Sequence, residues 1–137
     1  MHLLTRAEAP DWFEPTGFYC HNESGNIFSH LLPGLILAWR GLQVGFDLSH
    51  PDEAVVALHL VSAVLCLSLS ALYHTGLNHS PPVAHRWLRL DYGGILALIL
   101  GNLLSGVHFG FYCDPVLKMR YWSLVGSMGG ISLESET

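Results

Sequence analysis

The sequence predicts an all-α membrane protein with three transmembrane helices and the start of a fourth. Half of the 137 residues are hydrophobic and only 12% are charged, whereas soluble domains carry about twice that fraction of charge. Three apolar runs each reach about 20 residues, the length that a helix needs to cross ~30 Å of hydrocarbon. These two observations favour a chain that enters the bilayer several times.

The first 26 residues form a polar N-terminal segment before the first apolar run. They mix acidic and basic residues with prolines and lack the apolar stretch of a cleaved signal. The first span is predicted over residues 27–46 and must itself direct insertion. Arg40 interrupts it, so the span either ends near Trp39 or lets Arg40 extend to the interface.

The second and third spans are better defined by their composition. The second is predicted over residues 54–77, after an acidic turn at 47–53 whose Pro51 suits the start of a helix. The third covers residues 90–112, opens with Asp91 and has no charge beyond its first turn. We expect the chain to cross the membrane three times by residue 112.

The last apolar stretch, residues 121–133, is too short to be a complete span. Its ~13 residues would make ~20 Å of helix, and a polar tail, residues 134–137, follows. The sequence therefore predicts an incomplete fourth helix.

Charge and cysteine content exclude several classes of function. Six Lys and Arg against eleven Asp and Glu give a net charge of -5, which argues against a nucleic-acid partner. Cys20, Cys66 and Cys113 form neither a disulfide framework nor a C-x-x-C pair. The predicted spans place equal numbers of Lys and Arg on the two sides of the membrane, so charge alone does not set the orientation of the chain in the bilayer.

Nine histidines are unusual beside six Lys and Arg, because histidine is the commonest metal ligand. His2, His50 and His85 fall in predicted tails or loops, where a solvated side chain is expected. His59 and His108 lie in spans but far from the other polar residues, and we expect them to be buried and hydrogen-bonded.

His74 differs because it stands near the end of the second span, one helical turn after Ser70. Asp91 opens the third span after a short connection, so Ser70, His74 and Asp91 can converge on one face of the membrane. An imidazole with oxygen groups suits zinc. The alternative interpretation makes Asp91 a helix N-cap and His74 an interface residue.

Four segments around these residues resemble the progestin and adipoQ receptor family. They are HNESGNIFSHLLPG, SALYHTGLNHS, LRLDYGGILALILGN and SGVHFGFYCDP. Their order and spacing match over about residues 18–126. The family includes the adiponectin receptors, haemolysin III-like proteins and fungal proteins tied to zinc homeostasis, and the details look most like the fungal branch.

The resemblance implies a seven-helix bundle with a cytosolic N-terminus and a zinc ion near the cytosolic face. The family's zinc is held by one His at the end of the second helix, His74 here, and by two from an H-x-x-x-H motif on the last helix. Its Ser and Asp beside the zinc match Ser70 and Asp91. This chain contains no H-x-x-x-H motif, so one of three His ligands is present and the chain looks truncated.

The resemblance also implies the function: a multi-pass receptor-like protein in the plasma membrane or an endomembrane, linked to lipid or sterol and zinc homeostasis signalling. The alternative is a zinc-dependent, ceramidase-like lipid amide hydrolase when full length, with Asp91 and Ser70 as the catalytic candidates, or an inactive truncated fragment. Expected partners are membrane lipids, a lipid or peptide ligand, and a second copy or a full-length relative.

Overall fold

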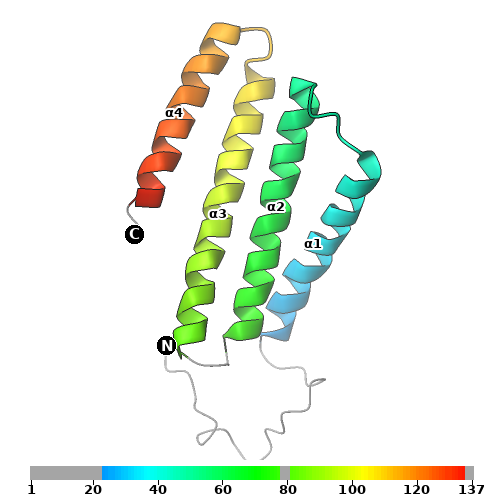
Figure 1. The fold of residues 1–137 in the computed structure, drawn as a ribbon, viewed down its shortest axis with the longest axis vertical. Coiled ribbons are helices and arrows are strands. Elements are labelled where there is room, and N and C mark those ends of the chain that lie inside the picture. The colour runs from blue at the N-terminus through cyan, green and yellow to red at the C-terminus, as the bar shows by residue number, and fades with distance from the viewer. Residues whose placement is uncertain (1–22, 78–80, 135–137) are drawn as a thin grey trace, which may run out of the picture.

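Four antiparallel α-helices form a single row in the computed structural model, which describes residues 23–77 and 81–134. They are α1 (Ser24–Val44), α2 (Pro51–Gly76), α3 (Pro81–Gly110) and α4 (Pro115–Glu134). Within the described residues each helix packs only against its neighbours in sequence, so the row has two open faces (Figure 1). The predicted all-α class is confirmed for this part of the chain.

Two of the described helices, α2 and α3, are long and apolar enough to cross a membrane. Only 28% and 17% of their apolar windows is buried, whereas a core helix of a soluble protein would be mostly buried. Their exposed apolar surface is therefore suited to lipid or to further helices. His30, Arg40 and Gln43 interrupt the apolar sequence of α1, which is therefore not one of these two helices. The predicted count of three spans stays a prediction.

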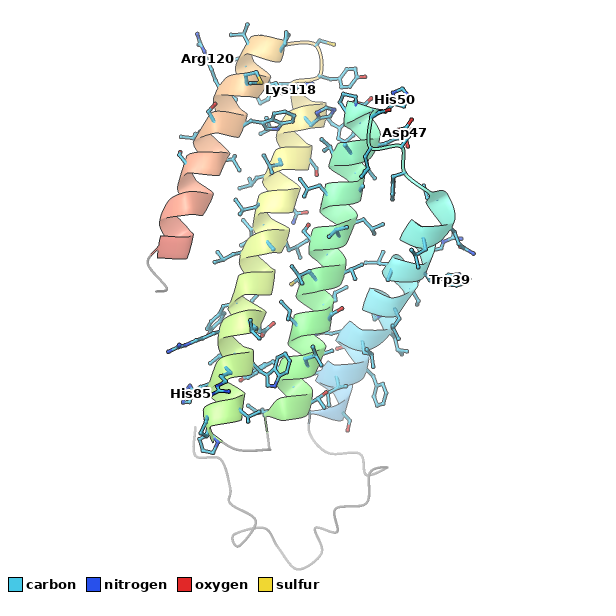
Figure 2. The ribbon with its side chains drawn as sticks, viewed as in Figure 1. Trp39, Asp47, His50, His85, Lys118 and Arg120 are labelled. Atoms are coloured by element: carbon cyan, nitrogen blue, oxygen red, sulfur yellow. The ribbon has the colours of Figure 1, made fainter. Side chains whose placement is uncertain are left out.

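The start of α2 agrees with the acidic turn recognised in the sequence. The helix begins at Pro51, and the Glu53 carboxylate accepts a hydrogen bond from the Asp47 backbone N–H at 2.7 Å. The Ser49 hydroxyl and backbone N–H donate to Asp47, and these bonds lower the pKa of the Asp47 carboxyl. Asp47 and His50 mark this end of the row in Figure 2.

The start of α3 corrects two expectations. The helix begins at Pro81, so Asp91 lies ten residues inside it and is not an N-cap. His85, expected in a loop, is an exposed residue of the same helix. Hydropathy marks where a chain enters hydrocarbon, whereas Pro81 at the first position begins a helix outside it. The segment carrying Arg86 and Arg89 is therefore helical although it is charged.

α4 also begins earlier than its apolar stretch. The Asp114 carboxylate accepts hydrogen bonds from the backbone N–H groups of Val116 and Leu117, at 3.1 and 3.0 Å, and caps the helix ahead of Pro115. Most of the predicted N-terminal segment, residues 1–22, and residues 135–137 of the predicted tail lie outside the described residues.

α2 and α3 make the most extensive contact among the described helices, and glycines on α3 permit their close approach. A Cβ at Gly94 would lie 3.0 Å from the Cys66 Cα, and one at Gly101 would lie 3.0 Å from the Ser62 Cβ and still closer to the Ser62 hydroxyl. Small residues let membrane helices approach to backbone contact. This contact fixes the register of α3 along α2, and it therefore sets which turn of α2 lies level with Asp91.

Candidate functional site

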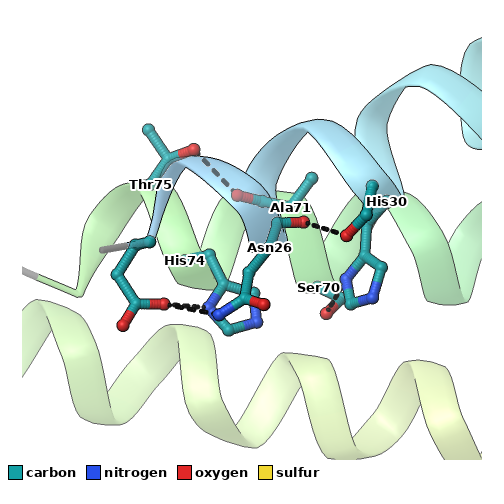
Figure 3. A network of polar contacts seen from close by, with 8 residues as sticks. Asn26, His30, Ser70, Ala71, His74 and Thr75 are labelled. Atoms are coloured by element: carbon teal, nitrogen blue, oxygen red, sulfur yellow. Dashed lines mark hydrogen bonds and ion pairs between the residues drawn. The ribbon is translucent and has the colours of Figure 1, made fainter. Parts of the chain in front are cut away.

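α1 begins, α2 ends and α3 begins at the same end of the row (Figure 1). Polar side chains gather at this end. α1 and the residue before it contribute Glu23, Asn26 and His30, whereas α2 contributes Ser70 and His74 (Figure 3). Together with Asp91 of α3 these residues are called the His74 cluster.

His74 is held by a carboxylate from another helix. Its Nδ1 lies 2.8 Å from Glu23 Oε2, and the two side chains are only 18% and 11% exposed. Asn26 Nδ2 donates to the same oxygen at 3.0 Å. The contact leaves Nε2 as the imidazole nitrogen that can bind a further group.

Ser70 is held in a similar way. Its buried hydroxyl lies 2.7 Å from His30 Nδ1, and the His30 and His74 ring centroids are 5.8 Å apart. Glu23, Asn26 and His30 are separated by three and then four residues, the spacing that places side chains on one helix face. No site role was predicted for Glu23 or His30 from the sequence, although their helical spacing was a usable signal.

Asp91 faces the last turns of α2. One turn later along α3, Gly94 meets Cys66 and Leu69, and one turn earlier Trp87 meets Gly76, so Asp91 is level with Ser70. The side chain is 9% exposed, and its Oδ1 is buried with no hydrogen-bond partner among the described residues. A buried carboxylate oxygen without a donor is costly, so this position suits a bound group.

The predicted convergence of Ser70, His74 and Asp91 on one end of the helices is therefore observed, and their chemical roles stay predictions. The donors are an imidazole nitrogen and a carboxylate oxygen, both zinc ligands. The described residues contain no group of three or more His, Cys, Asp or Glu able to hold a metal. They fit one side of a zinc site and do not complete it.

Two other histidines, His108 and His59, lie within the helices but away from the His74 cluster. His108 is 3% exposed and its Nε2 lies 2.6 Å from Asp52 Oδ1, so the expected buried, hydrogen-bonded state is confirmed. His59 is half-buried, and its buried Nδ1 has no partner within the part of the chain that is described. The expected hydrogen bond is therefore not made at that nitrogen.

The opposite end of the row carries a second polar cluster beside a pocket of about 590 Å³. Both oxygens of Asp52 are engaged there, by His108 and by the Tyr112 hydroxyl at 2.9 Å. Lys118 lies over the Tyr112 ring and Trp122 stacks on His108. These contacts join α2, α3 and α4, and we interpret the cluster as structural. Lys118 marks its position in Figure 2.

Comparison with known proteins adds an independent finding. Residues 18–135 match the family described as haemolysin-III related. The chain is 32% identical over 122 residues to the adiponectin receptor protein of Drosophila melanogaster, and 33% identical over 113 residues to progestin and adipoQ receptor-like protein 1 of Caenorhabditis elegans. It is 36% identical over 101 residues to an ADIPOR-like receptor of Saccharomyces cerevisiae.

These alignments cover most of this chain but a small part of each relative. They span 85%, 80% and 69% of the chain, and 27%, 26% and 32% of the fly, worm and yeast proteins. The His74 cluster lies within the residues that match the family. The chain thus corresponds to between a quarter and a third of the length of these relatives.

Proposed function

Because the chain belongs to the haemolysin-III related family, together with adiponectin and progestin and adipoQ receptors, we propose that its His74 cluster forms one side of a zinc site in a receptor-like membrane protein. The observation that carries the proposal is the Glu23 carboxylate on His74 Nδ1, with Ser70 and Asp91 at the same level. Metal-binding histidines commonly donate their other ring nitrogen to a carboxylate in this way.

The proposal assigns one ligand to this chain and the remaining ones to another segment. His74 supplies Nε2, and two further histidines come from a last helix of a seven-helix bundle, beyond the length that the chain shares with its relatives. The N-terminus and the zinc site then face the cytosol, and the protein signals in lipid or sterol and zinc homeostasis. Its partners are membrane lipids, a lipid or peptide ligand, and a second copy or a full-length relative.

The proposal is tested by comparing two proteins in lipid nanodiscs. One is the 137-residue chain, and the other, called the extended protein, has this chain in place of the matching segment of the Drosophila adiponectin receptor protein. We expect the extended protein to hold one zinc ion and the chain alone to bind zinc at least about 100-fold more weakly, because ligands are missing. An extended protein that is folded but holds no zinc when zinc is supplied would refute the proposal.

A second candidate function is hydrolysis of a lipid amide, favoured by the buried Asp91 oxygen beside Ser70. Zinc, when bound, polarises a carbonyl and makes a nearby water more acidic. Asp91 would accept a proton from the attacking water and return it to the amine nitrogen as the amide C–N bond breaks, and the Ser70 hydroxyl would donate a hydrogen bond to the substrate oxygen. On this proposal the 137-residue chain alone is inactive.

Asp91→Asn is expected to lower ceramide hydrolysis by the extended protein about 100-fold, the lower range for loss of a general base. The amide keeps the shape of the side chain and cannot accept the proton. Hydrolysis is measured by release of sphingosine. Asp114→Asn at the opposite end is the matched control and should retain full activity, since Asn also caps helices. Equal rates for Asp91→Asn and wild type would remove the hydrolase candidate and leave the receptor-like zinc site.

A further inference from the structure

We propose that Glu23 is a positioning residue that fixes the tautomer and orientation of the His74 imidazole, so that Nε2 is presented to the metal. The inference rests on the proposed zinc site and extends it to α1, which contributes no proposed zinc ligand. Glu23, which precedes α1, would then control the tautomer and orientation of a zinc ligand on α2.

The geometry of the contact sets the tautomer. An ionised carboxylate only accepts hydrogen bonds, so the His74 Nδ1 that lies 2.8 Å from Glu23 Oε2 carries the hydrogen. In the neutral ring Nε2 then has the lone pair that a metal requires. An imidazole in water favours the opposite tautomer, with hydrogen on Nε2. Limited solvent access at this pair, 18% and 11% exposed, reduces competition from water.

Glu23 is itself held in place. Asn26 Nδ2 donates to the same Oε2 at 3.0 Å, and the Ile27 N–H donates to the Glu23 carbonyl at 2.9 Å as α1 begins. Further along α1, the buried Gly34 lies against Leu67 of α2, where a Cβ would be in van der Waals contact. The packing of α1 on α2 therefore fixes the carboxylate relative to His74. A small shift of α1 would release the ring.

A structural ion pair would make the same contact but would not fix the tautomer in the metal-binding form. Two properties separate these roles. A positioning role requires Nδ1–H and a bare Nε2 in the metal-free protein, and it requires metal affinity to change when the carboxylate is removed. A purely structural role requires only that stability falls.

The first test is nitrogen NMR of the full 137-residue chain in nanodiscs, with histidine ¹⁵N-labelled and the pH mildly alkaline. His74 is identified by its loss in His74→Gln. Wild type is expected to show hydrogen on Nδ1, and Glu23→Ala to shift the population to Nε2–H. Glu23→Gln should largely retain the wild-type tautomer, because its amide oxygen still accepts. Glu53→Ala, at the other end of α2, is the matched control, and unchanged His108 signals show that each variant is folded.

The second test titrates Zn²⁺ into the extended protein carrying the same substitutions, because only that protein has all the proposed ligands, and follows the His74 Nε2 resonance. We expect Glu23→Ala to raise the dissociation constant 10- to 100-fold, the usual effect of losing a carboxylate behind a metal-binding histidine, with Glu23→Gln in between. Wild type with hydrogen on Nε2, or equal zinc affinities, would overturn the role of Glu23 and leave the proposed zinc site standing. Zn²⁺ that leaves His74 unmoved in wild type would instead overturn the zinc site, while the tautomer still decides the role of Glu23.

Discussion

His74→Ala is expected to lower the zinc affinity of the extended protein by about 1,000-fold or more. The proposed site has three protein ligands, and removing one forfeits a large share of a binding free energy that reaches roughly 10–16 kcal/mol in structural sites. A 1,000-fold loss corresponds to about 4 kcal/mol. The loss should exceed that of Glu23→Ala, because the ligand itself is removed. Ceramide hydrolysis, if present, should disappear with the zinc.

Zinc affinity is measured by competition with a chromophoric chelator. The matched control is His85→Ala, which removes an exposed imidazole near the same end of the row, on α3. It should bind zinc as wild type does. If both variants bound zinc with wild-type affinity, the metal would lie elsewhere and His74 would be left as an interface residue.

Gly101→Leu is expected to destabilise the α2–α3 pair by about 2–3 kcal/mol, the upper range for overpacking a tight interface. A Cβ at this position would overlap the Ser62 hydroxyl and lie 3.6 Å from the His59 Cα. The larger side chain must push the two helix backbones apart, since no flexible side-chain end can absorb it. The register that places Asp91 level with Ser70 would be loosened with it.

Stability is measured as the free energy of unfolding in mixed detergent micelles. Gly106→Leu is the matched control on the same helix, because nothing lies within 4 Å of its Cβ position. It should be neutral or slightly stabilising, since leucine favours helix over glycine. Ser62→Gly should recover part of the loss in Gly101→Leu. A Gly101→Leu variant as stable as Gly106→Leu would show that the close contact does not hold the helices together.

The helices were largely predictable because their signals are local. An acidic turn with Pro51 marks the start of α2, and long apolar runs mark α2 and α3. The start of α3 was not predictable from hydropathy, because Pro81 begins the helix among charged residues that stay outside hydrocarbon. Hydropathy alone therefore leaves Asp91 as a possible helix cap, although it lies well inside the helix.

The site was predictable only in part, for a related reason. Ser70 and His74 share a face through helical spacing, and the short connection to α3 brings Asp91 near. Glu23 and His30 reach the site through packing of α1 against α2, with contacts across 51 and 40 residues of sequence. A local sequence pattern does not predict which side chains of a neighbouring helix will pack against a given helix face. The spacing on α1 indicated a common face but not its partner.

In the proposed site, His74 binds zinc through Nε2, and every ligand of the metal is a nitrogen or an oxygen atom. X-ray absorption at the zinc edge of the extended protein tests it most directly. We expect nitrogen or oxygen neighbours at about 2.0–2.1 Å, with histidine outer-ring scattering that decreases in zinc-loaded His74→Ala and is unchanged in His85→Ala. Sulfur neighbours at about 2.3 Å, or a spectrum that His74→Ala leaves unchanged, would contradict it.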